Sequence, residues 1–200
     1  MWFRKAPSLT LEKQLEVLTG CGIRLRDSMT VEHFIEMHPR QNYDSEPYLL
    51  ALTVMGGEMA KAPFDDFSDD IWRLDPTRLR FNAEDGGQGA YLKIAAKMSR
   101  LAGGSMPIAD ARDHVDMAAN HAWLSFSLDG MPYRWELQAQ GGKLDSKVFS
   151  KFAELLKLVG AGKRFYVLEL KDQGRLIGAA RPDVLGNLRE KTGLDFNWLS

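Results

Sequence analysis

The chain has little cysteine and no long apolar run. Cys21 is the single cysteine among 200 residues, so an intrachain disulfide is excluded. Secreted domains of this size often use disulfides, which favours a reducing compartment. No window approaches the roughly 20 apolar residues that a membrane helix needs, and Met1–Pro7 lacks the apolar run of a signal peptide. These absences predict a bacterial cytoplasmic protein that does not engage a membrane.

Motifs that carry catalysis or bind cofactors are also missing. The sequence contains neither a Walker loop nor a Gly-x-Ser-x-Gly elbow. His114 and Asp116 share one face of an expected strand, with His121 nearby, and this pattern could ligate a metal. No fourth ligand is evident, so polar positions on an edge strand or loop are the preferred interpretation. We predict no catalytic residue, no cofactor and no metal; the alternative is an enzyme or small-ligand-binding protein with its site near His114 and Asp116.

Neither sign of charge dominates the whole chain, which has 26 Lys and Arg against 27 Asp and Glu and a formal net charge of −1. The charges are unevenly distributed. Residues 43–85 contain ten acidic and four basic side chains, a net charge of −6, whereas residues 143–200 contain eleven basic and seven acidic ones, a net charge of +4. An acidic segment repels phosphates, so we expect no nucleic acid as its partner.

The densest acidic segment also holds large apolar side chains, and we call Pro63–Trp72 the acidic–aromatic stretch. One interpretation is a solvated loop whose aromatic side chains fill the core. The other is a docking surface, because interface centres favour aromatic residues and charged rims set association rate and partner choice. A docking surface of this kind would bind a basic protein through Phe64, Asp65, Asp66, Phe67, Asp69, Asp70 and Trp72.

A β-hairpin is the clearest local element. Residues 123–128 and 133–137 alternate apolar and polar side chains, and Asp129-Gly130 between them tolerates the positive φ angles of a tight turn. One face of the hairpin should therefore carry Leu124, Phe126, Leu128, Tyr133, Trp135 and Leu137.

Apolar spacing and capping residues predict the remaining elements. Helices are expected near residues 11–20, 31–38, 48–55, 89–102, 147–159 and 183–192. Further strands are expected near residues 72–74, 112–117, 164–170 and 175–180, and the apolar tail 194–199 should dock on the body.

This order of elements predicts an α+β fold in one domain, residues 1–200. Residues 1–105 form a mainly helical part. Residues 106–200 read as hairpin, helix, hairpin and helix, which predicts a four-stranded antiparallel sheet that carries helices on one face.

Several segments resemble a group of uncharacterised bacterial cytoplasmic proteins. They are Phe3–Glu12, Gly20–Ile23, Leu101–Gly104, His114–Asp116 and Ala122–Phe126. Small bacterial proteins with an acidic patch are also similar to immunity proteins, which neutralise toxins of competing bacteria. The resemblance implies a non-enzymatic inhibitor that covers the active site of a basic toxin with its acidic loop. A third hypothesis is a subunit that self-associates through the hairpin at residues 123–137.

Overall fold

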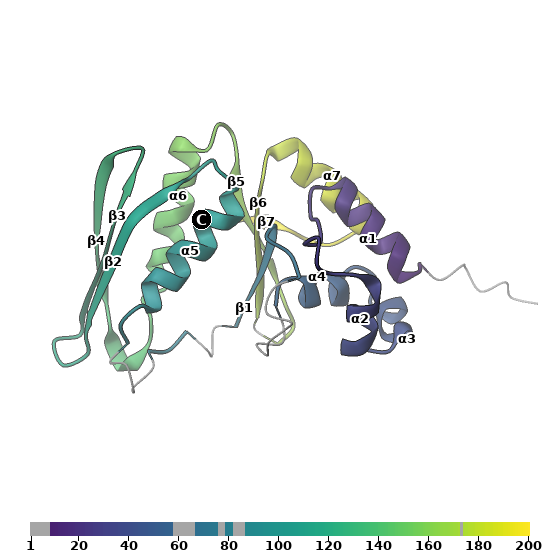
Figure 1. The fold of residues 1–200 in the computed structure, drawn as a ribbon, viewed down its shortest axis with the longest axis horizontal. Helices are drawn as coiled ribbons and strands as arrows, with labels where there is room; N and C mark the ends of the chain where they lie inside the picture. Colours follow the sequence, from purple (N-terminus) through teal and green to yellow (C-terminus); the bar gives the residue numbers. More distant parts are fainter. Residues whose placement is uncertain (1–8, 58–66, 76–78, 82–86, 173) are drawn as a thin grey trace, which may run out of the picture.

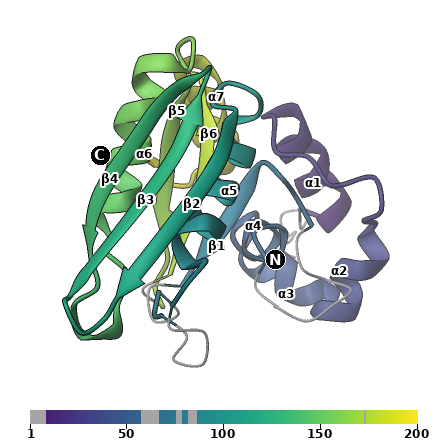
Figure 2. The ribbon, with the colours of Figure 1, turned by 60° about the vertical axis from the view of Figure 1, so that its left-hand side comes forward.

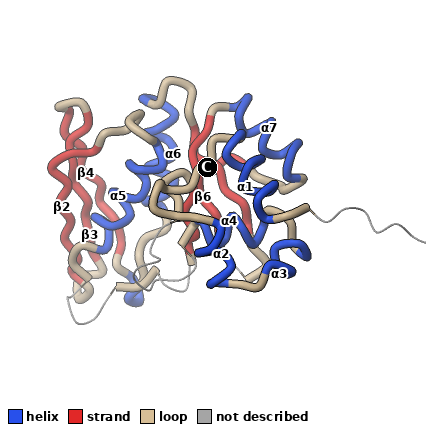
Figure 3. The backbone as a smooth tube through the Cα atoms, turned by 45° about the vertical axis from the view of Figure 1, so that its right-hand side comes forward, coloured by secondary structure: helices blue, strands red, loops and turns tan. Residues whose placement is uncertain are grey.

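Four layers of secondary structure make up the protein (Figure 1). The computed structural model describes residues 9–57, 67–75, 79–81, 87–172 and 174–200. A three-stranded sheet is followed by a layer of two helices, then by a four-stranded sheet, and then by a layer of five helices. Figure 3 shows the same alternation of strands and helices. The α+β class predicted from the sequence is confirmed.

The predicted helices are present close to their predicted bounds, and the structure adds a short helix at Arg40–Ser45 that was not predicted from the sequence. Residues 48–55, which periodicity alone could not assign to helix or strand, form a helix as predicted. The helices are α1 Leu11–Gly20, α2 Val31–Met37, α3 Arg40–Ser45, α4 Leu49–Met55, α5 Ala90–Ala102, α6 Lys147–Val159 and α7 Pro182–Thr192. The strands are β1 Ile71–Leu74, β2 Ile108–Asp116, β3 His121–Leu128, β4 Met131–Gln138, β5 Arg164–Glu169, β6 Arg175–Ala180 and β7 Asn197–Trp198.

The predicted hairpin is confirmed as β3 and β4. Asp129 and Gly130 form its turn with φ angles of 49° and 77°. Phe126 lies opposite Tyr133 in the register that the alternation predicted. Its ring also lies 4.9 Å from that of Trp135 and 6.0 Å from that of Phe152 on α6. The inner face of this sheet is therefore held by an aromatic cluster.

The prediction that both hairpins share one four-stranded sheet is wrong. The first hairpin pairs with β2 in the order β2-β3-β4, and the second lies in a separate sheet of order β1-β6-β5-β7. The physical reason lies in α5 and α6, which pack between the two sheets and bury the inner face of each (Figure 1). The three-stranded sheet carries helices on one face, whereas the four-stranded sheet is covered on both.

Alternation along β5 explains why the four-stranded sheet has two buried faces. Phe165 and Val167 belong to the apolar core shared with α5 and α6. Tyr166 and Leu168 belong to the second core, which lies against the N-terminal helices and α7. All four side chains are buried, so β5 reads as a continuous apolar run, as strands covered on both faces do.

Gln14 organises the N-terminal helical layer. Its side chain is fully buried on α1. The amide nitrogen donates to the carbonyls of Leu9 and Tyr43 at 2.8 and 3.0 Å, and the amide oxygen accepts the N–H of Tyr48 at 2.7 Å. A buried amide is stable only when its donors and acceptor are satisfied, and here that requirement ties α1 to α3 and to the start of α4.

The C-terminal tail docks on the body, as predicted. Phe196 is fully buried against Tyr166, with ring centroids 5.4 Å apart. The two residues of β7 then pair with β5 and complete one edge of the four-stranded sheet.

Candidate functional site

The acidic–aromatic stretch is only partly described. Phe64, Asp65 and Asp66 lie outside the described residues. Phe67 is fully buried in the N-terminal core, and its ring lies 4.9 Å from that of Phe34. Phe67 cannot enter a partner's pocket without leaving this core, so the prediction that it anchors a partner gives way to a packing role.

Trp72 is also engaged by the protein's own core. It lies on β1, is partly buried, and packs against the apolar core around α5 and α6. Its ring is 6.1 Å from that of Phe149 on α6. The aromatic side chains that the structure describes in this stretch thus follow the interpretation in which they fill the core.

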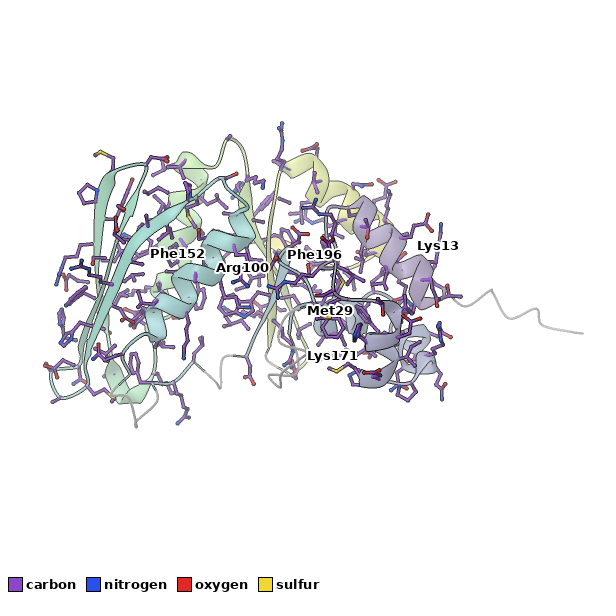
Figure 4. All side chains as sticks on the ribbon, in the orientation of Figure 1. Lys13, Met29, Arg100, Phe152, Lys171 and Phe196 are labelled. Atoms are coloured by element: carbon purple, nitrogen blue, oxygen red, sulfur yellow. The ribbon has the colours of Figure 1, made fainter. Side chains whose placement is uncertain are left out.

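Asp69 remains half exposed and meets arginines from two different elements. Its Oδ1 accepts hydrogen bonds from Nε of Arg26 at 3.1 Å and from Nη2 of the same side chain. Nη1 of Arg100 on α5 lies 3.5 Å from the same oxygen. The side chain of Arg100 projects from α5 near the middle of the molecule, on the side of the N-terminal helices (Figure 4). Asp69 therefore links the segment before α2 to α5.

The carboxylate of Asp70 is bound by the same segment, through both the backbone and the side chain of Arg24. Its Oδ2 accepts the backbone N–H of Arg24 at 2.9 Å and Nε of Arg24 at 3.4 Å. The backbone N–H of Asp70 donates to Oγ of Ser68 at 3.0 Å. These bonds fix both aspartates at the entrance to β1.

Together these groups line an open pocket of about 400 Å³, which we call the charged pocket. Its lining residues are Arg24, Leu25, Arg26, Asp27, Asp69 and Asp70. The Arg26 hydrogen bond, with the charges of Arg26, Arg100 and Lys97, lowers the pKa of Asp69 against the opposing effect of desolvation. Asp69 is thus ionised at neutral pH, and the pocket presents charges of both signs to solvent.

The arginines were not identified from the sequence. A local signal exists in the sequence, because Arg24 and Arg26 alternate with Ile23 and Leu25, a pattern typical of a half-buried extended segment. Their pairing with Asp69 and Asp70 joins residues more than 40 positions apart, and no local pattern encodes such a contact.

The candidate metal ligands do not converge. The ring of His114 packs against Trp123 with centroids 6.0 Å apart. Oδ1 of Asp116 accepts the backbone N–H of Ala119 at 2.9 Å, and Nε2 of His121 lies 2.7 Å from Glu136. Among the residues that the structure describes, no three His, Cys, Asp or Glu side chains are grouped as metal ligands would be.

Comparison of the chain with protein-family models, with curated proteins and with solved structures yields no match. In the described part of the chain, no helix combines the length and the apolar character required to cross a bilayer.

Proposed function

We propose that this protein is a non-enzymatic, cytoplasmic protein-binding module of the immunity type, which neutralises a basic bacterial toxin through the charged pocket. The observation that supports the proposal is the environment of Asp69. Its carboxylate is half exposed, has a lowered pKa and lines an open pocket of about 400 Å³, which is large enough to admit a partner's side chain. In this proposal the carboxylate would pair with an arginine or lysine of the partner.

Binding would proceed by exchange of ion pairs. Arg26 and Arg100 hold Asp69 in the free protein, and a partner's guanidinium would take the place of one of them. Ion pairs with this degree of exposure contribute only about 0–1 kcal/mol to stability, so their replacement costs little. The protein's own arginines also keep the carboxylates oriented toward the pocket before the partner arrives.

The test is genetic and biochemical. The gene for an immunity protein is expected to lie next to the gene for its toxin. Each open reading frame beside this gene is therefore expressed alone and together with this protein. The proposal expects one product to inhibit growth and this protein to relieve the inhibition. Asp69→Lys should abolish the relief. Asp183→Lys should preserve it, because Asp183 is an exposed carboxylate on α7 that does not line the charged pocket.

Two results would contradict the proposal. One is that no neighbouring product inhibits growth in the absence of this protein. The other is that Asp69→Lys relieves toxicity as fully as the unmodified protein does. A thermal melt of both variants shows whether any loss of relief comes from unfolding.

A further inference from the structure

Strand β4 leaves one side of its backbone open. It is the last strand in the order β2-β3-β4, and in the described part of the chain no strand pairs with its other side. Figure 2 shows the three strands in front, with β4 at the margin of the sheet and α6 behind it. An edge of this kind carries backbone N–H and C=O groups that can pair with another chain.

The hairpin turn determines which residues of β4 point outward. Leu128 and Met131 flank a two-residue turn and form its closing hydrogen-bonded pair. Bonding to β3 then recurs at every second residue, so residues 133, 135 and 137 face β3. Residues 132, 134, 136 and 138 direct their backbone groups to the open side.

Contacts at the end of the strand support this assignment. The N–H of Gln138 donates to Asp145 at 3.1 Å, and its C=O accepts the hydroxyl of Tyr91 at 2.9 Å. Pro132 has no N–H. Arg134 and Glu136 are therefore the residues whose outward N–H and C=O groups are both available for pairing. Pro132 limits the pairing at one end and Gln138 at the other.

Lysine side chains lie beside the middle of this edge, and the carboxylate of Asp145 lies at its end. Nζ of Lys151 on α6 lies 5.8 Å from the ring centroid of Trp135 on β4. Lys147 precedes it by one helical turn and projects from the same side of α6. Glu136 is already matched by Arg134 and by His121, at 2.8 and 2.7 Å. A strand added here would meet the two lysines on one face and Arg134 on the other.

The edge also offers apolar surface. Tyr133 and Trp135 are only partly buried, although both pack on Phe126. A strand beside β4 would cover their exposed portions. The edge thus combines main-chain pairing, partly exposed aromatic rings and positive charge, the combination by which domains bind extended peptides.

From these features we infer that the β4 edge is a docking site for an extended acidic peptide segment of another protein, which adds a fourth strand to the three-stranded sheet. Residues of the segment that face α6 would place carboxylates beside Lys147 and Lys151. The site is separate from the charged pocket, so either can fail experimentally without the other.

The test uses two synthetic peptides, one alternating glutamate with valine and one alternating lysine with valine. Each is titrated into the isotopically labelled full chain, and backbone amide shifts and hydrogen exchange are recorded. We expect saturable amide shifts with the acidic peptide and none with the basic peptide. The acidic peptide should also protect the amides of Arg134 and Glu136 from hydrogen exchange. Equal binding of both peptides, or acidic-peptide shifts that map elsewhere, would overturn the proposal.

Variants separate charge from main-chain pairing. Lys151→Glu should weaken the acidic peptide by roughly five- to tenfold, because it reverses a charge beside the added strand. Glu136→Pro removes an outward N–H and should reduce binding further while the fold persists. Arg112→Glu, on the opposite edge strand of the sheet, is the matched control and should bind as the unmodified chain does.

Association of the protein with itself is the competing use of this edge. Sedimentation of the chain alone over a range of concentrations detects it. A dimer that Glu136→Pro dissociates would show that a second copy occupies the edge, and it would overturn the assignment to an acidic peptide.

Discussion

The two sheets differ in how completely the protein covers them. The four-stranded sheet has an apolar core on each face. On its β1 edge, the backbone N–H of Arg73 donates a hydrogen bond to the carbonyl of Gly56 at 2.7 Å. Among the residues that the structure describes, no element covers the second face of the three-stranded sheet and no strand pairs with the outer edge of β4 (Figure 2). The comparison separates two roles, because the sheet covered on both faces supplies much of the buried core, whereas the proposed docking edge belongs to the sheet with one bare face.

The bare sheet still depends on its inner face, and Phe126 tests that dependence. Phe126→Ala removes a side chain that is 3% exposed and in contact with Tyr133, Trp135 and Phe152. We expect a loss of about 3–5 kcal/mol in unfolding free energy by chemical denaturation.

Ser125→Ala is the matched control on the uncovered face. It should change the unfolding free energy by less than about 0.5 kcal/mol. Equal losses from the two variants would mean that the sheet buries the opposite face.

The covered sheet should be sensitive to added volume. Gly178 on β6 lies opposite Tyr166 on β5, and a Cβ at position 178 would overlap the Tyr166 hydroxyl and ring. Both neighbouring layers are packed, so the ring has no space to move. Gly178→Ala should therefore cost about 1–3 kcal/mol of unfolding free energy, measured by denaturant titration.

The same substitution at an open position should have the opposite sign. A Cβ at Gly186 on α7 would meet no atom within 4 Å, and alanine is the better helix former by roughly 0.5–1 kcal/mol. Gly186→Ala should raise the melting temperature. A rise for Gly178→Ala as well would refute the tight packing of the covered sheet.

The charged pocket should contribute least to stability. The pKa of Asp69 is lowered in the folded protein, so its ion pairs stabilise the fold above the ordinary pKa range of aspartate. That contribution is lost as pH falls through the lower folded pKa. Because Asp69 is half exposed and screened, the amount should stay below about 1 kcal/mol.

Asp69→Asn should accordingly lower stability slightly at neutral pH and not in strong acid. Denaturation curves at several pH values measure the difference between the two proteins. A difference that grows toward low pH would contradict the assigned sign.

Local patterns predicted the elements better than their assembly. Asp129-Gly130 between alternating runs identified the first hairpin and its register, and both are confirmed. The same patterns could not show that α5 and α6 lie between the hairpins. Each apolar face must be covered by another element, and local patterns do not specify which element covers it. A helix between two sheets satisfies the same periodicity as a helix on one sheet.

The candidate site was predictable to a smaller extent. The acidic–aromatic stretch drew attention to Asp69 and Asp70, which line the charged pocket, but composition could not distinguish a binding aromatic from a core one. Phe67 and Trp72 pack on Phe34 and Phe149, which lie more than 30 positions away in the sequence. The arginines that pair with the aspartates are equally distant and follow from the tertiary fold.

The central claim is that Asp69 recognises a basic partner and that Arg26 competes with that partner. The most direct measurement titrates an arginine-rich peptide into the unmodified chain, Arg26→Gln and Asp69→Asn, with Arg112→Gln and Asp183→Asn as charge-matched controls. The account predicts that Arg26→Gln binds more tightly than the unmodified chain although it is less stable, that Asp69→Asn binds more weakly, and that the controls are unchanged. Equal affinity of Arg26→Gln, Asp69→Asn and their controls would contradict it.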